Sequence, residues 1–158
     1  MKKIALVLLL AICLSCFGVT AFAEERTAPS LEITYYTVPM RATVSILYAV
    51  DVAGYENPES IKIIANKGSG DEEITNSGYT TINGKTCLVF EYSNLSAAEM
   101  DTKVKAKVKY GDQVGSTVVE YSVKEFATNY ETSGGQYVSL VKAMIAYGDA
   151  VKAMQAAN

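Results

Sequence analysis

Polar and apolar residues alternate along much of the chain between residues 31 and 123. The clearest run covers residues 42–52, where every second residue is apolar: Ala42, Val44, Ile46, Tyr48, Val50 and Val52. In a second run, residues 103–110, lysines alternate with apolar residues. Because the side chains of a strand point alternately to its two faces, this period of two predicts strands with one buried face. The alternation therefore predicts a mainly β domain.

Turn-forming residues separate the predicted strands. Asn83 and Gly84 lie between two β-prone runs and predict a tight hairpin, because both turn positions require a positive φ. Residues 66–78 are rich in glycine, serine and acidic residues, which favours a long loop. Residues 96–100 are expected to form a single helical turn. Many short strands separated by turns are typical of a β-sandwich.

The spacing of apolar residues changes after residue 123. Beyond a break at residues 133–135, apolar residues recur every three or four positions and predict a helix of about five turns. The predicted stripe contains Val141, Met144, Ile145, Gly148, Val151 and Met154. A helix with such a stripe has to bury it against the sandwich. We therefore predict an immunoglobulin-like or fibronectin III-like β-sandwich over about residues 30–123, with a helical segment packed on it over about residues 124–157.

The first 23 residues have the features of a signal peptide. Lys2 and Lys3 precede the apolar run 4–14, and residues 21–23 (Ala-Phe-Ala) match a signal-peptidase site. The mature protein is expected to be one domain, residues 24–158, that is secreted or held at the cell surface. Processing as a lipoprotein at Cys16 is the alternative; it is disfavoured because Cys13 occupies a position where the motif requires an aliphatic residue.

The composition excludes several functional classes. Removing residues 1–23 leaves 12 of the 14 basic side chains against 17 acidic ones, a formal net charge of −5, which disfavours nucleic acid as a partner. Only Cys87 remains of the three cysteines, so no internal disulfide can form. The chain has no histidine, which excludes Ser-His-Asp triads and histidine-ligated zinc. We predict that the protein is not an enzyme and has no cofactor or metal.

Three short motifs do not support a chemical function. Residues 78–86 resemble a phosphate-binding loop, but the glycine spacing is wrong and a strand follows. Ser139 and Lys142 match the serine-x-x-lysine motif of penicillin-recognising enzymes without the further motifs that such enzymes need. The acidic run 71–73 lacks the regular spacing of a calcium loop.

Two surface features are candidates for ligand binding. The first is a lysine row on one strand face, spaced about 6.6 Å apart along the strand, formed by Lys103, Lys105, Lys107 and Lys109. Lysines of this kind either protect an edge strand from pairing with other chains or bind an anionic polymer, and the pattern favours edge protection. The second is a set of tyrosines, among which we expect Tyr36, Tyr55 and Tyr79 to be exposed.

The segment 95–150 resembles an uncharacterised C-terminal domain family of secreted and surface proteins from anaerobic Gram-positive (clostridial-type) bacteria. Three stretches carry the resemblance: residues 96–101 (Ser-Ala-Ala-Glu-Met-Asp), residues 121–127 (Tyr-Ser-Val-Lys-Glu-Phe-Ala) and residues 140–148 (Leu-Val-Lys-Ala-Met-Ile-Ala-Tyr-Gly). The resemblance implies an accessory role beside carbohydrate-binding or wall-anchoring modules. It implies no catalytic residues.

The sequence thus favours a secreted or surface-associated module for adhesion or ligand binding. A carbohydrate-binding accessory module of a polysaccharide-degrading system is the alternative. The expected partners are a cell-wall polymer, a glycan or a surface protein, with no transmembrane segment after removal of the signal peptide.

Overall fold

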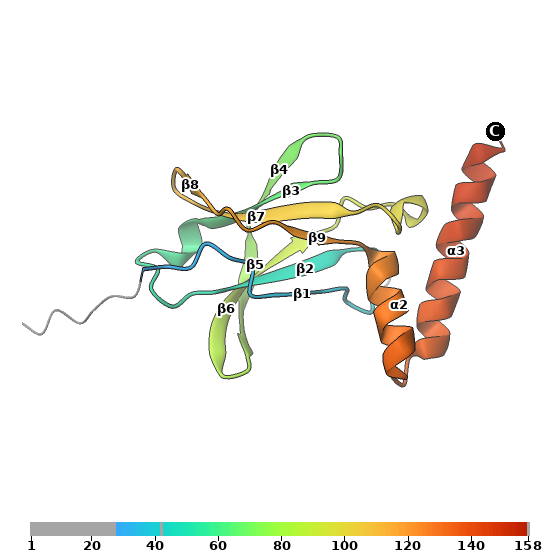
Figure 1. Cartoon of the computed structure of the whole chain (residues 1–158), viewed down its shortest axis with the longest axis horizontal. Coiled ribbons are helices and arrows are strands. Elements are labelled where there is room, and N and C mark those ends of the chain that lie inside the picture. Colours follow the sequence, from blue (N-terminus) through green and yellow to red (C-terminus); the bar gives the residue numbers. More distant parts are fainter. Residues whose placement is uncertain (1–27, 42, 158) are drawn as a thin grey trace, which may run out of the picture.

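A computed structural model describes residues 28–41 and 43–157 of the chain (Figure 1). The predicted signal peptide, the mature N-terminus and Cys16 lie outside the described residues. The strands form two antiparallel sheets, one of four strands and one of five. In spatial order the first sheet contains β1 (Tyr35–Thr37), β2 (Ile46–Asp51), β6 (Lys85–Tyr92) and β5 (Asn76–Ile82). The second contains β4 (Asp71–Ile74), β3 (Ile61–Asn66), β7 (Val104–Tyr110) and β8 (Gln113–Val114), with β9 (Val119–Tyr121) also paired to β7.

The core lies between the two sheets, and the period-two residues supply it. On β2 the side chains of Ile46, Tyr48 and Val50 are buried. The other sheet contributes Val104, Ala106 and Val108 of β7, all of them fully buried. Apolar burial of this kind is the main favourable contribution to folding. The prediction of a β-rich chain with two antiparallel sheets is therefore confirmed.

The predicted hairpin forms at Asn83 and Gly84. Both residues have positive φ, 51° and 79°, and the flanking residues Ile82 and Lys85 are paired across the turn. Positive φ at both central positions is the geometry that matches the twist of the two strands. This turn fixes the register between β5 and β6.

The prediction of a loop over residues 66–78 is wrong in part. β4 forms inside this segment and pairs with β3, and β5 already begins at Asn76. The polar side chains of β4 are mostly exposed at the edge of the sheet. An edge strand of this kind needs no apolar alternation, which is why its sequence resembles a loop.

The C-terminal segment forms two helices, α2 (Val123–Ser133) and α3 (Val138–Ala156), as predicted. Ser122 caps α2 by accepting a 3.1 Å hydrogen bond from the backbone N–H of Glu125, and Gly134 ends it with a φ of 70°. The helices cover one end of the two-sheet body, and α3 is the outermost element (Figure 1). It lies against α2 and the short helix η2 (Ala97–Glu99); a second short helix, η1 (Pro58–Ser60), precedes β3.

The predicted stripe of α3 is buried only in part. Val141 is buried, and Met144 and Ile145 pack against the core cluster. Met154 is exposed, because the last turn of α3 extends past η2. Gly148, which belongs to the predicted stripe, is buried in the contact with η2.

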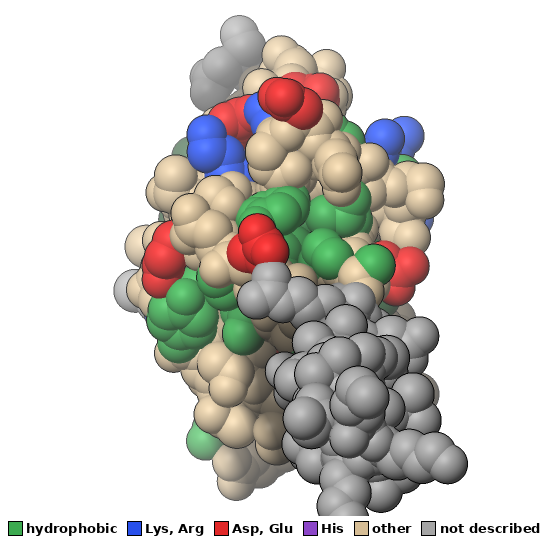
Figure 2. Space-filling model, turned by 90° about the vertical axis from the view of Figure 1, so that its left-hand side faces the viewer, with side chains coloured by type: hydrophobic (Ala, Val, Ile, Leu, Met, Phe, Trp, Pro, Cys, Tyr) green, Lys and Arg blue, Asp and Glu red, His purple; other side chains and the backbone are tan. Residues whose placement is uncertain are grey.

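The opposite end of the molecule shows how charge is distributed. The visible described surface is mostly uncharged, with a central apolar patch and separate acidic groups, and its basic side chains lie in the upper part beside acidic ones (Figure 2). That part is on the side of the five-stranded sheet in Figure 1.

Candidate functional site

The lysine row lies on an internal strand. β7 pairs with β3 on one side and with β8 and β9 on the other. Edge protection is needed only where backbone N–H and C=O groups are free to pair with another chain. The prediction that these lysines protect an edge strand is therefore wrong. Strand alternation shows which face a residue occupies, but it does not show how many neighbours the strand has.

Two carboxylates compensate part of the lysine row. Glu73 of β4 accepts hydrogen bonds from Lys109 and from Lys62, which lowers the pKa of Glu73 to about 2. Glu120 of β9 lies 3.3 Å from Lys103 and 3.8 Å from Lys105. Each of these carboxylates thus interacts with two ammonium groups, and the face keeps a positive excess.

Lys107 differs from the rest of the row. It is paired with Ile64 of β3. On its other side, continuing the pairing of β7 with β9 by one residue places Val118 beside it. No carboxylate among residues 28–41 and 43–157 forms an ion pair with Lys107. Lys107 is only partly exposed, and a partly buried ammonium group interacts more strongly with an added anion than one in open water, because fewer water molecules screen it.

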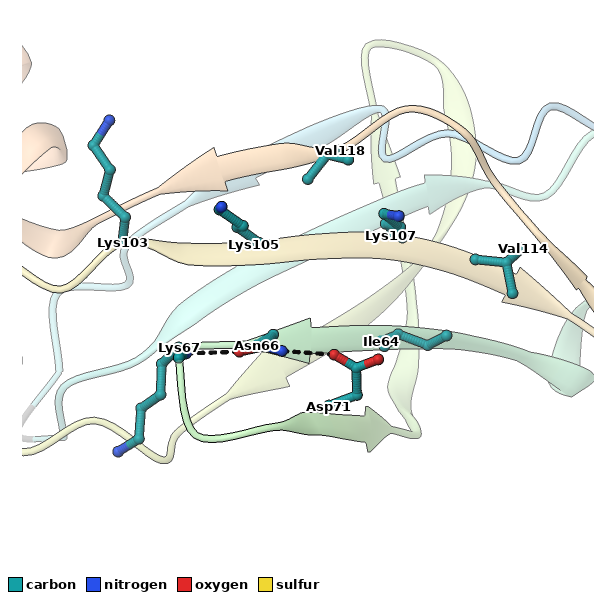
Figure 3. A pocket seen from close by; sticks show the side chains of 10 residues that line it. Ile64, Asn66, Lys67, Asp71, Lys103, Lys105, Lys107, Val114 and Val118 are labelled. Atoms are coloured by element: carbon teal, nitrogen blue, oxygen red, sulfur yellow. Dashed lines mark hydrogen bonds between the residues drawn. The ribbon is translucent and has the colours of Figure 1, made fainter.

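Lys105 and Lys107 lie side by side along the floor of a groove of about 600 Å³ (Figure 3). β3 and its following loop form one wall, and residues of β8 and the segment before β9 form the other. The lining residues are Ile64, Asn66, Lys67, Gly68, Asp71, Lys103, Lys105, Lys107, Val114 and Val118. We call this feature the lysine groove. Lys109 of the row lies outside the lining, where it is held by Glu73.

The rim of the lysine groove is fixed by polar contacts. Asp71, the one acidic lining residue, accepts a 2.7 Å hydrogen bond from the side-chain amide of Asn66. The same Asn66 side chain accepts a 2.6 Å bond from the backbone N–H of Gly68. Lys67 donates to Glu99 and to the backbone carbonyl of Asn94. These contacts hold the loop after β3 against the sheet, so the groove is formed without a ligand.

The three candidate tyrosines do not form one site. Tyr36 and Tyr79 are exposed as predicted, but they lie on β1 and β5, the two opposite edges of the four-stranded sheet. Tyr36 also packs edge to face against Tyr121, with ring centroids 4.7 Å apart. No aligned row of exposed tyrosines therefore exists among these three residues.

The prediction that Tyr55 is exposed is wrong. Only 8% of Tyr55 is accessible to solvent. Its hydroxyl donates a 2.6 Å hydrogen bond to the carbonyl of Ser30, and its ring contacts Tyr110 edge to face at 5.0 Å. The turn after β2 thus folds back onto the body and carries Tyr55 inward, which local sequence does not reveal.

Sequence reasoning missed a second groove, on the outer face of the four-stranded sheet. It has a volume of about 520 Å³, and its lining is formed by Tyr35, Tyr36, Thr37, Arg41, Leu47, Tyr48, Ala49, Thr80, Ile82 and Val89. Tyr35 is paired with Ala49, and Tyr36 with the buried Tyr48, so Tyr35 faces outward. The sequence suggested the reverse, because Tyr35 continues the alternation of Leu31 and Ile33. We call this feature the Tyr35 groove.

No family model, curated protein or solved structure matches the chain. The resemblance of segment 95–150 to a domain of secreted Gram-positive proteins thus stays a prediction. Within the described ranges, His, Cys, Asp and Glu side chains form no group of three or more that could hold a metal ion. None of the described helices is both long enough and apolar enough to cross a membrane.

Proposed function

We propose that the protein is an extracellular, non-enzymatic binding module whose lysine groove holds an anionic polymer of the cell surface. The single observation that carries this proposal is Lys107, an ammonium group on an internal strand with no ion-pair partner in the described structure. Lysine at an internal strand position adds nothing to edge protection. An anionic ligand would supply the missing counter-charge.

The spacing of the groove suits a polymer rather than a single ion. Lys105 and Lys107 lie on the same face of β7, about 6.6 Å apart. Both lie on the floor of an open, elongated surface groove rather than in a closed cavity. A chain of repeating phosphate or carboxylate groups can contact both ammonium groups, while Ile64, Val114 and Val118 pack against its uncharged parts. Wall polymers of the teichoic acid type have this chemistry.

Export supports the same conclusion. The predicted signal peptide places the mature protein outside the cytoplasm, where anionic wall polymers occur. The overall negative charge disfavours non-specific adhesion to such polymers. The described basic residues outside the lysine groove, among them Lys85 and Lys142, are each paired with a carboxylate.

The proposal is tested with purified protein and isolated Gram-positive cell walls. We expect the protein to sediment with intact walls at low salt and to be released as the salt concentration rises beyond the physiological range, where charges are screened within about 8 Å. Walls from which the phosphate polymers have been extracted should retain much less protein. Equal retention on extracted and intact walls, unaffected by salt, would contradict the proposal.

A carbohydrate-binding accessory role is the second candidate, and the Tyr35 groove favours it. Aromatic rings beside polar groups bind sugars through ring stacking and hydrogen bonds. The Tyr35 hydroxyl lies 3.4 Å from the side-chain amide of Asn83, and Arg41 is held by Glu91 at 3.2 Å. Neutral glycan binding would be insensitive to salt and lost in Tyr35→Ala. Binding of the protein to an array of plant, host and bacterial glycans distinguishes the two proposed functions, because only the second predicts binding to neutral glycans.

We also infer that the two sheets form a sandwich of the immunoglobulin or fibronectin III type. Support comes from the nine short antiparallel strands that the described residues form, in two sheets with a shared apolar core. Folds of this type present their outer sheet faces and end loops to ligands. The lysine groove lies on such an outer face.

A further inference from the structure

α3 carries an exposed apolar stripe beside the face by which it contacts the rest of the protein. From the N-cap residue onward, the residues of this α3 stripe alternate in spacing between three and four: Tyr137, Leu140, Met144, Tyr147, Val151 and Met154. Leu140 is 53% exposed and Tyr147 63% exposed. The buried contacts of α3 are made by Val141 and Gly148, and Met144 lies at the border between the two faces, where it packs against the core. α3 is therefore apolar both toward its own domain and away from it.

None of the charged residues of α3 lies in the stripe: Lys142 and Asp149 are on the opposite side of the helix, and Lys152 is beside the buried contact face. Lys142 lies 2.8 Å from Glu131, Asp149 lies 3.7 Å from Lys124, and Lys152 pairs with Asp101. Each therefore makes an ion pair within its own chain. The positions that flank the stripe on its outer side are small and uncharged, Ala143 and Ala150 among them. The exposed face of α3 thus carries no charge of its own.

We propose that the α3 stripe is the interface of a two-fold symmetric dimer, in which α3 of one copy packs against α3 of a second copy. A spacing of three and four is that of the a and d positions of paired helices, whose side chains interlock along a shared seam. Two identical stripes without charges meet with no like-charge repulsion, and the flanking alanines let the helices approach closely. A helix lying on a membrane surface would instead need basic residues along the flanks of its apolar face.

The position of α3 allows this contact. It is the outermost element at one end of the molecule, so a second helix can lie along it without meeting either sheet (Figure 1). Its 19 residues span about 28 Å. Two such stripes bury close to the lower limit of about 1,000 Å² for a specific interface, which indicates a weak dimer in reversible exchange with the monomer. The inference is independent of the ligand that the lysine groove binds.

The test is sedimentation equilibrium of the purified protein over a concentration series, in parallel with Leu140→Glu and Ala153→Glu. Both substitutions add one negative charge to an exposed position of α3, but only Leu140 lies in the stripe. We expect the unaltered chain and Ala153→Glu to dimerise alike. Leu140→Glu should raise the dimer dissociation constant at least about tenfold, because a carboxylate has to be desolvated in the interface.

Co-sedimentation of the same three proteins with vesicles of mixed neutral and anionic lipid tests whether the α3 stripe binds a membrane surface instead of a second copy of the chain. A chain that stays monomeric throughout the series overturns the proposal, whether or not it binds vesicles. A dimer that Leu140→Glu leaves unchanged also overturns it, since the interface then lies elsewhere. Dimerisation that is lost in Leu140→Glu and kept in Ala153→Glu, with circular dichroism unchanged in both, supports it.

Discussion

Gly148 of α3 lies so close to Ala97 of η2 that a Cβ atom at residue 148 would stand 2.8 Å from the Ala97 carbonyl oxygen. The same atom would lie 2.9 Å from the sulfur of Met100. Glycine is unfavourable inside a helix, so its presence in the middle of α3 has a steric reason. This contact attaches α3 to the connection that leads into β7.

Gly148→Ala should therefore destabilise the protein although it raises helix propensity. Overpacking costs about 1–3 kcal/mol, against a gain of about 1 kcal/mol for replacing glycine in a helix. A backbone carbonyl cannot move aside easily, so we expect the overpacking cost to exceed the propensity gain, with a net loss of up to about 2 kcal/mol in the free energy of urea unfolding. Ala150→Gly, at an exposed position of α3, measures the contribution of helix propensity alone to the free energy of unfolding. A more stable Gly148→Ala would show that α3 does not dock closely on η2.

Val141 is the second point at which α3 is anchored. It is buried, with 1% of its surface exposed. Val141→Ala removes two buried methyl groups and should lower the free energy of unfolding by about 2 kcal/mol. Val114→Ala, the same change at an exposed position of β8, should cost less than about 0.5 kcal/mol. Equal unfolding midpoints for the two variants would mean that α3 folds as an independent appendage.

The acid stability of the protein should depend on Glu99. Its carboxylate accepts hydrogen bonds from Lys67 at 2.8 Å and from the backbone N–H of Ser96 at 2.9 Å, which lowers the pKa of Glu99 to about 2. Because this pKa is lower in the folded chain, the stabilising effect is present above the ordinary pKa near 4.5 and is lost as the pH falls toward 2. The group is partly exposed, so the effect is below about 1 kcal/mol.

Glu99→Gln should therefore flatten the dependence of unfolding free energy on pH between about 4.5 and 2. Asp112→Asn, at an exposed turn between β7 and β8, removes one carboxylate in the same way and serves as the control for the change in net charge. Denaturant titrations at a series of pH values measure the free energy of unfolding of both variants. An unaltered slope in Glu99→Gln would show that the Lys67 contact does not persist in solution.

The strands and the face of each lysine could be predicted from the sequence because both depend on local alternation. The hairpin at Asn83 and Gly84 was predictable for the same reason. The pairing of the strands could not be predicted in this way. β3 and β7 are about 40 residues apart in the chain, and no residue pattern in either strand indicates that the two are neighbours. The internal position of β7, and hence the role of Lys107, depends on that pairing.

The candidate site could be predicted only in part. The lysines on its floor follow from the alternation, whereas Ile64 and Val118 join them through the sheet register. The burial of Tyr55 depends on a hydrogen bond to Ser30, 25 residues away, which no local pattern indicates. The orientation of Tyr35 depends on its register with Ala49, and the Tyr35 groove was missed for that reason.

The most direct test of the lysine groove is the affinity of two matched double variants for a soluble anionic wall polymer. Lys105→Gln with Lys107→Gln removes two positive charges from the groove floor, and Lys85→Gln with Lys142→Gln removes two from distant surfaces. Both variants have the same net charge. Equilibrium binding at low and at physiological salt is compared with that of the unaltered protein, with circular dichroism as the check on folding.

We expect the groove variant to bind about tenfold more weakly at low salt, with a smaller salt dependence, since two exposed ionic contacts contribute about 0.7 kcal/mol each. At physiological salt the distant variant should bind within about twofold of the unaltered protein, because charges are screened within about 8 Å there and neither lost charge lines the groove. Equal affinity of the groove variant and the unaltered protein, or an equal loss in both double variants, would contradict the assignment of the lysine groove as the binding site.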